Sequence, residues 1–288
     1  MFNLNYHKVF IQNIQSLQLN ILRLDELHPI VSGNKWFKLQ LQLQDAIKKN
    51  YTTITTFGGA YSNHIVATAF ACQQMGLASI GIIRGNETKA LNHTLLAAQQ
   101  FGMQLQFVTR EAYANKQQYI NNNNIYYINE GGYAVLGANG VADIYQWIDE
   151  TYTHIVCAVG TGTMMAGLVK GALPHQKVVG INVLKGNTTL LQQVKTLLNV
   201  DENTKQFELI NGYHFGGYAK HPQALITWMN DLYKKQQLPT DIVYTSKLLF
   251  AVTDLQQQGY FDKNSKIMVI HSGGLQGNLS LPKGTLVF

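Results

Sequence analysis

TTITTFGGAYSNHIVATAFACQQMG, residues 52–76, contains the pattern that decides the fold. Its first six residues, 52–57, are threonine, isoleucine and phenylalanine, which favour a β-strand. Two glycines follow, and then an apolar run typical of a helix, which stops at Gly76. A strand, a glycine turn and a helix in this order form the repeating unit of an α/β protein.

The same alternation continues along the chain. We expect further strands at 78–84, 103–108, 125–128, 154–160, 177–183 and 266–271, and helices at 89–102 and 161–171. Such alternation needs crossover connections, so the sheets should be mostly parallel. The sequence therefore predicts an α/β protein with two three-layer domains.

The domain boundaries are predicted from composition. We expect a small α/β domain at 50–133, inserted into a larger domain formed by 1–49 and 134–288. The asparagine run 121–124 and the glycine-rich stretch 131–140 resemble linkers.

The bulk composition excludes several classes. The chain has 288 residues and a net charge of +6, but no basic run that would suggest a nucleic-acid partner. Its nine histidines form no HExxH motif, so we expect no metal site. Cys72 and Cys157 lie in apolar stretches and are predicted to be buried free thiols. We find no signal peptide or membrane-span pattern, which predicts a cytoplasmic protein without a membrane partner.

The stretch SGNKWFKLQ, residues 32–40, places two lysines near the start of a predicted helix. The helix dipole disfavours cations there. A desolvated lysine loses its charge readily and can then form a Schiff base. Residue type and spacing do not choose between Lys35 and Lys38, and Lys38 could also be a helper or a surface charge.

VGTGTMMAGL, residues 159–168, follows an expected strand and opens a helix. Glycines, free N–H groups and the hydroxyls of Thr161 and Thr163 suit a phosphate. The stretch is neither a P-loop nor a dinucleotide fingerprint, because the GK[ST] ending and the GxGxxG spacing are missing. The alternative is a tight turn that allows close helix–sheet packing.

Two further junctions carry polar residues. Ser62, Asn63 and His64 follow the strand at 52–57, where open α/β sheets bind ligands. The alternative there is helix capping by Ser62 or Asn63. Tyr244 and Thr245 begin the apolar run of IVYTSKLLF, 242–250, and they could equally be a strand residue and a helix cap.

Together, a reactive lysine and a single-phosphate site suit pyridoxal 5′-phosphate. The order GNK, GGxxSN, GTGT, VYT and HxGG, over about residues 30–280, resembles a family of pyridoxal-phosphate enzymes. These are the 1-aminocyclopropane-1-carboxylate deaminases and D-cysteine desulfhydrases, which have the tryptophan-synthase-β-like fold (fold type II). The resemblance implies that the larger domain binds the cofactor and that the protein is a homodimer acting on a small amino acid.

The resemblance also implies residue roles. Lys35 would hold the cofactor as a Schiff base, Asn63 would hydrogen-bond its ring hydroxyl, and Thr245 would face its ring nitrogen. The loop Thr161–Gly162–Thr163 would bind the phosphate. Ser62, Asn63 and His64 would bind the substrate, and Ser62, Tyr218 and Tyr244 would act with Lys35 in catalysis.

His64 and Thr245 are the desulfhydrase-like choices at two positions that separate the branches. A threonine offers the ring nitrogen only a neutral hydrogen bond, so the electron sink is milder than beside a carboxylate. We therefore expect β-elimination from a substrate such as D-cysteine, giving pyruvate and ammonia. The alternatives are 1-aminocyclopropane-1-carboxylate deamination, a racemase, dehydratase or β-replacement reaction, and a homologue that binds the cofactor without turnover.

Overall fold

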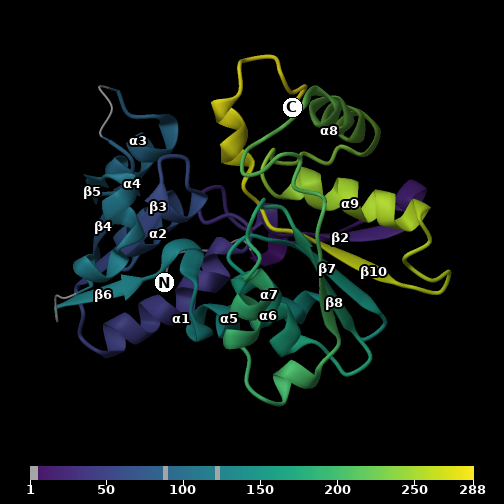
Figure 1. Ribbon diagram of the computed structural model, residues 1–288, viewed down its shortest axis with the longest axis horizontal. Helices are drawn as coiled ribbons and strands as arrows, with labels where there is room; N and C mark the ends of the chain where they lie inside the picture. The colour runs from purple at the N-terminus through teal and green to yellow at the C-terminus, as the bar shows by residue number, and fades with distance from the viewer. Residues whose placement is uncertain (1–5, 87–89, 121–123) are drawn as a thin grey trace.

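The computed structural model describes residues 6–86, 90–120 and 124–288, and it contains two sheets side by side (Figure 1). The larger sheet has the strand order β1-β2-β10-β7-β8-β9, and the smaller has the order β5-β4-β3-β6. The strands are β1 (Ile11–Ile14), β2 (Leu19–Arg23), β3 (Thr53–Gly59), β4 (Ala78–Arg84), β5 (Met103–Val108), β6 (Ile125–Ile128), β7 (His154–Val159), β8 (Lys177–Asn182), β9 (Phe207–Ile210) and β10 (Ile267–His271). The pairing of β1 with β2 is antiparallel, and the other described pairs are parallel. The predicted α/β class with mostly parallel sheets is confirmed.

Helices cover both faces of the larger sheet (Figure 1). Along β7, Ile155 and Cys157 face one hydrophobic core, while Val156 and Ala158 face another. This alternation is what a sheet buried on both sides requires. The first core includes side chains of α5 (Val135–Ala142), α6 (Thr163–Gly171) and α7 (Leu190–Thr196), and the second includes those of α8 (Gln223–Gln236) and α9 (Thr245–Gln257). None of the helices in the described ranges is long and apolar enough to cross a membrane.

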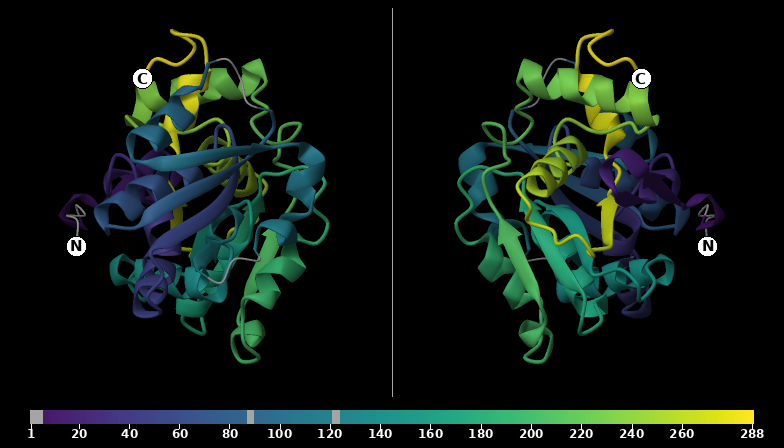
Figure 2. Two further views of the ribbon diagram at one scale, coloured as in Figure 1. Left: turned by 90° about the vertical axis from the view of Figure 1, so that its left-hand side faces the viewer. Right: turned by 90° about the vertical axis from the view of Figure 1, so that its right-hand side faces the viewer.

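The smaller sheet is also covered on both faces, and Figure 2 shows it from its own side. The remaining α-helices are α1 (Lys35–Lys48), α2 (Asn63–Gln74), α3 (His93–Gln100) and α4 (Arg110–Ala114). Ile65 of α2 and Leu95 of α3 pack together in one core, and Tyr113 of α4 packs with Phe57 in another. Ile54 and Ile128 of this sheet share the core of the larger sheet, so both halves pack against each other. The proposed boundaries at 49/50 and 133/134 remain a prediction.

The prediction of a linker at 131–140 is wrong. This stretch contains a short 3₁₀ helix and most of α5. A Cβ on Gly140 would lie 2.1 Å from the carbonyl oxygen of Phe37, so this glycine lets α5 pack tightly against α1. Most of the asparagine run, 121–123, lies outside the described residues. The short strands β1, β2 and β9 and the helices α7 (Leu190–Thr196) and α8 were not predicted from the sequence.

The carboxyl ends of parallel strands from both sheets meet in one place. Gly59 at the end of β3 and Arg84 at the end of β4 line the same cavity as Gly160, which follows β7, and Ser272, which follows β10. This is the edge at which open α/β sheets bind ligands.

Candidate active site

A cavity of about 590 Å³ lies between the two sheets, a volume typical of small-molecule sites. Of the residues singled out in the sequence, Lys35, Ser62, Asn63, His64, Thr161, Tyr218 and Tyr244 line it. Gly162, Thr163 and Thr245 do not line it. Gly162 and Thr163 follow the lining residue Thr161 in the chain, and Thr245 follows the lining residue Tyr244. The structure therefore brings together, from five separate segments of the chain, most of the side chains that the motifs indicated.

Lys35 is the first residue of α1, and its Nζ donates a hydrogen bond to Oδ1 of Asn34 at 2.7 Å. Burial lowers the pKa of the Lys35 amine to about 8, and the negative charge of Asp241 partly opposes this shift. About one tenth of the amine is therefore uncharged at pH 7, far more than for an ordinary lysine, and this is the form in which a lysine acts as a nucleophile.

Lys38 lies one turn further along α1 and also lines the cavity. Its side chain is only 7% exposed, so the surface-charge alternative is wrong. Burial and the neighbouring Lys35 lower its pKa to about 7. Gly132 packs against Lys38, and the preceding Gly131 packs against Thr161, which places Lys38 beside the glycine–threonine loop.

Ser62 occupies the N-cap position of α2, but its side chain makes no capping hydrogen bond. The capping alternative therefore does not account for this hydroxyl. Next to it, Oδ1 of Asn63 accepts a hydrogen bond from Nε2 of Gln276 at 2.6 Å. Gln276 lies in the 3₁₀ helix Leu275–Ser280, far away in sequence, and sequence reasoning missed it.

The hydrogen bonds of His64 determine its tautomer. The Oγ1 hydroxyl of Thr56 donates to the carbonyl of Ile128 at 2.8 Å, so it accepts from Nε2 of His64, also at 2.8 Å. The proton is thereby assigned to Nε2, and Nδ1 keeps a free lone pair that is buried without a partner. Burial and the positive charges of Lys35 and Lys38 lower the pKa of His64 to about 3. His64 is thus a neutral hydrogen-bond acceptor at the cavity.

The glycine–threonine loop forms the start of α6. Gly162 holds the N-cap position at φ +89°, a left-handed conformation that favours glycine. The Oγ1 atoms of Thr161 and Thr163 lie 3.3 Å apart. The free N–H groups of the first turn and these hydroxyls can bind an anion.

Tyr218 and Tyr244 face each other, with ring centroids 6.5 Å apart and ring planes at 76°. Burial raises the pKa of both phenols, and the negative charge of Asp241 raises it further, so both stay protonated at neutral pH. Lys247 fixes the loop that carries Tyr218, because its buried Nζ donates to the carbonyls of His214 and Gly217 at 3.0 and 2.8 Å.

Asp241 is fully buried behind Tyr244, and sequence reasoning missed it. Its Oδ1 accepts from the N–H groups of Val243 and Tyr244, and its Oδ2 accepts from the N–H and hydroxyl of Thr245. Asp241 therefore anchors the start of α9. Thr245 is the first residue of this helix and Tyr244 its N-cap, so the alternative of Tyr244 as a strand residue is wrong. The signal that could have revealed Asp241 is an acidic residue a few positions before a helix start.

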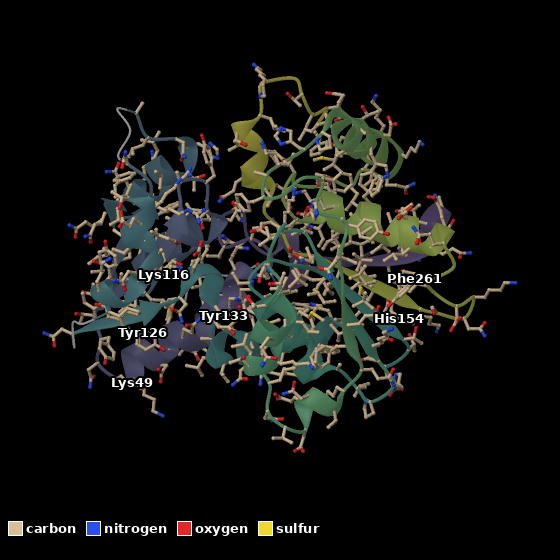
Figure 3. All side chains as sticks on the ribbon, viewed as in Figure 1. Lys49, Lys116, Tyr126, Tyr133, His154 and Phe261 are labelled. Carbon is tan, nitrogen blue, oxygen red and sulfur yellow. The ribbon has the colours of Figure 1, made fainter. Side chains whose placement is uncertain are left out.

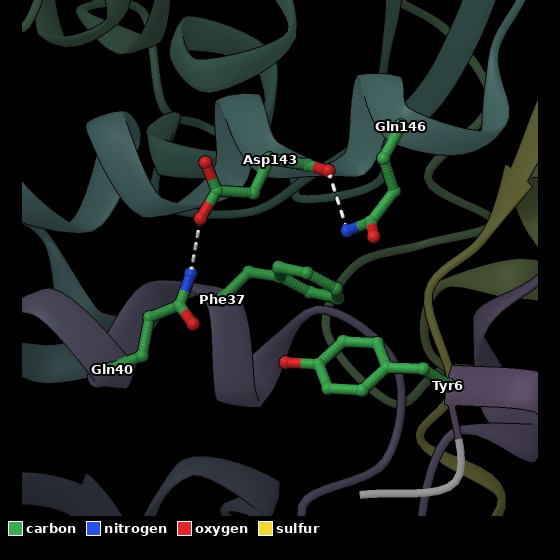
Figure 4. Close-up of a pocket in the computed structure, with 5 residues that line it drawn as sticks. All are labelled: Tyr6, Phe37, Gln40, Asp143 and Gln146. Atoms are coloured by element: carbon green, nitrogen blue, oxygen red, sulfur yellow. Dashed lines mark hydrogen bonds between the residues drawn. The ribbon is translucent and has the colours of Figure 1, made fainter.

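A second hollow of about 380 Å³ lies on the other side of α1 (Figure 4). It is lined by Tyr6, Phe37, Gln40, Asp143 and Gln146. Asp143 already accepts from Nε2 of Gln40 at 2.7 Å, and its carbonyl accepts from Nε2 of Gln146 at 2.9 Å. This hollow contains none of the candidate residues.

Comparison with known proteins agrees with this site. A family model described as pyridoxal-phosphate dependent enzyme matches residues 13–273. A protein of Thermotoga maritima, provisionally named 1-aminocyclopropane-1-carboxylate deaminase, is 31% identical over 278 residues, which cover 88% of both chains. The D-cysteine desulfhydrase of Salmonella typhi is 26% identical over 281 residues, covering 88% of this chain and 86% of its own. A crystal structure of an ACC deaminase homologue has a TM-score of 0.80 at 25% identity, covering 94% of this chain and 90% of that one.

Fold, cavity and similarity together define an enzyme that depends on an organic cofactor. The chain belongs to the family of pyridoxal-phosphate dependent enzymes, which confirms the resemblance found in the motifs. The cavity fits this cofactor, because it offers a buried lysine amine, a second buried lysine, and beside them a left-handed glycine turn at a helix start.

Proposed function

We propose that the protein catalyses the elimination and deamination of a small amino acid to pyruvate and ammonia, with D-cysteine as the preferred type of substrate. The observation that carries this proposal is the buried Lys35 amine, which shares one cavity with the Thr161 loop and the facing Tyr218 and Tyr244. The desulfhydrase-like residues His64 and Thr245 favour β-elimination, and so does the similarity to a D-cysteine desulfhydrase.

Bound pyridoxal phosphate supplies an electron-withdrawing ring that stabilises negative charge at the substrate's α-carbon. Lys35 provides the amine for its covalent attachment. The start of α6, with Thr161, Gly162 and Thr163, would hold the phosphate together with Lys38. Asn63 and Thr245 would be the partners of its ring.

The protein groups then handle the protons. With a pKa of about 8, the Lys35 amine would accept the α-proton near neutral pH. Tyr218 and Tyr244 remain protonated and can donate to the departing thiolate. Ser62 lies at the start of α2, where free N–H groups bind the substrate carboxylate, and the free Nδ1 of His64 offers an acceptor beside it.

A second candidate is 1-aminocyclopropane-1-carboxylate deamination, which the similarity to the Thermotoga maritima protein and to the ACC deaminase homologue favours. The desulfhydrase and deaminase branches differ in the side chain beside the cofactor's ring nitrogen, which is Thr245 in this chain and a carboxylate in the deaminases. If Thr245→Glu improves ring opening at the expense of elimination, the branch assignment holds. We also propose, from the resemblance, a cytoplasmic homodimer.

The proposal is tested by incubating the holoprotein with D-cysteine, L-cysteine, D-serine and 1-aminocyclopropane-1-carboxylate. We expect equal amounts of pyruvate and sulfide from D-cysteine, and a visible absorbance of bound cofactor that Lys35→Ala abolishes. Bound cofactor without pyruvate from any of the four substrates would identify a non-catalytic homologue and overturn the proposal.

A further inference from the structure

The chain uses arginine very sparingly. Of its 22 basic residues, only three are arginines: Arg23, Arg84 and Arg110. Arg23 is buried and paired with Asp25 at 2.6 Å. The other two both line the active-site cavity. Two of the three arginines of this lysine-rich chain thus line its active site.

The two arginines lie at one corner of the smaller sheet. Arg84 ends β4 and pairs in register with Val108, the last residue of the adjacent β5, and Arg110 begins α4 two residues later. Nη2 of Arg84 lies 3.6 Å from the position that a Cβ on Gly59 would occupy. The guanidinium of Arg84 therefore extends over the glycine turn that leads to Ser62.

One aromatic ring packs against Arg84. Its Cζ lies 5.4 Å from the ring centroid of Tyr113 on α4. Across the cavity, its positive charge partly opposes the rise in the pKa of Tyr218. Arg84 thus lines the cavity beside the glycine turn that leads to Ser62.

The positive charges of Arg84 and Arg110 have no ion-pair partner within the described residues. Among the described residues that line the cavity, Glu130 is the one acidic residue. Oε2 of Glu130 already forms an ion pair with Nζ of Lys116 at 2.7 Å. Lys116 is labelled in Figure 3. The cavity thus has a surplus of positive charge on the side of the smaller sheet.

The proposed reaction requires two anionic groups, the cofactor phosphate and the substrate carboxylate, and neither needs Arg84 or Arg110 as its partner. The cofactor phosphate is assigned to the start of α6 and Lys38, and the substrate carboxylate to the start of α2 at Ser62. A neutral side chain such as that of cysteine would give the two arginines nothing to bind. Guanidinium groups are suited to bidentate binding of oxyanions, more so than lysine.

We propose that Arg84 and Arg110 form a subsite for an oxyanion on the β-carbon of the substrate, either a phosphate ester or a sulfonate. This inference rests on the proposed function and names its substrate class. In the reaction, the α-proton is removed and its electron pair forms the Cα–Cβ double bond. The Cβ–O or Cβ–S bond breaks, and its electron pair leaves with phosphate or sulfite. Addition of water then gives pyruvate and ammonium without any oxidant.

The test compares kcat/KM of the holoenzyme for O-phosphoserine, cysteate and cysteine, each as both enantiomers. We expect the enzyme to turn over at least one anionic substrate in addition to D-cysteine, and the two anionic arms distinguish phosphate from sulfonate. Arg84→Gln and Arg110→Gln should each lower the anionic-to-cysteine ratio by about tenfold or more, since each removes a charge-assisted contact. Arg84→Lys keeps the charge but loses the bidentate geometry, so its loss should be intermediate.

Lys185→Gln is the matched control, because it removes an exposed positive charge that does not line the cavity. An equal loss in Lys185→Gln and the arginine variants would show general electrostatic attraction and overturn the subsite. Preference for cysteine, with a ratio that the arginine variants leave unchanged, would overturn it while the proposed elimination stands.

Binding of the unreactive analogue 2-amino-3-phosphonopropionate, measured by calorimetry on the holoprotein, separates the two proposals. If no substrate is turned over, the proposed function fails. Weaker binding of the analogue to Arg84→Gln than to Lys185→Gln would still support the subsite, and equal binding would refute it.

Discussion

The hydroxyl of Thr245 donates a hydrogen bond to Oδ2 of Asp241 at 2.8 Å and accepts one from the Asp241 N–H at 2.7 Å. A hydroxyl has a single proton, so Thr245 can offer any third group only a lone pair. We therefore expect the Thr245 hydroxyl to accept a hydrogen bond from the cofactor's ring nitrogen while its own proton is held by the Asp241 carboxylate. This revises the expectation that Thr245 offers the ring nitrogen a simple neutral hydrogen bond.

Replacing Asp241 should destabilise the start of α9. Asp241→Asn loses at least one of the bonds to Val243, Tyr244 and Thr245, because an amide has one acceptor oxygen instead of two. We expect a loss of about 1–3 kcal/mol in the free energy of unfolding, measured in urea. Asp231→Asn, at an exposed position of α8, is the control and should stay within about 0.5 kcal/mol of the parent. Equal stability of both variants would argue against the anchoring role.

His64 should make the fold sensitive to mild acid. Its folded pKa of about 3 lies below the ordinary value of 6.5, so the unfolded chain binds the proton more tightly. Stability is therefore retained above about pH 6.5 and lost as the pH falls from there toward 3. Lowering the pH from 7 to 5 should therefore reduce the free energy of unfolding by about 2 kcal/mol through His64 alone. His64→Gln should have a flatter stability profile over this range, and a profile parallel to the parent would contradict the assigned neutral form.

Capture of the cofactor should depend on pH through Lys35. The amine reacts in its uncharged form, and its pKa is lowered to about 8. We expect the rate at which the apoprotein regains visible absorbance with added pyridoxal phosphate to rise from pH 6 and level off above about pH 8. A rate that continues to rise steeply toward pH 10 would indicate an unperturbed lysine.

Gly140 is a test of the contact between α1 and α5. A Cβ there would lie 2.1 Å from the Phe37 carbonyl oxygen, so Gly140→Ala must separate the helices. We expect a loss of about 3 kcal/mol or more in the free energy of unfolding. Gly277→Ala is the matched control, because nothing lies within 4 Å of its added methyl group. A loss no larger than the control's would contradict the tight packing.

Local patterns in the sequence predicted the parts of the site that local structure creates. Lys35, Ser62 and Thr161 each follow a recognisable strand–turn–helix or helix-start pattern, and the parallel topology brings these junctions together. The strands from β3 to β8 were predictable for the same reason.

The features missed depend on contacts between distant segments. Gln276 reaches Asn63 across 213 positions, and Lys247 reaches the carbonyl of His214 across 33. Arg84 and Arg110 are single charged residues without a local motif, and only the pairing of β4 with β5 places them together. The glycine-rich stretch was misassigned because its close contact, the backbone of Phe37, lies about a hundred residues earlier.

The most direct test of the central claim is borohydride reduction of the holoprotein, followed by peptide mapping of the lysine that carries the cofactor. The account predicts a stoichiometric label on Lys35, at the start of α1, and none on Lys38. A label on Lys38, or no label in protein that contains the cofactor, would contradict it.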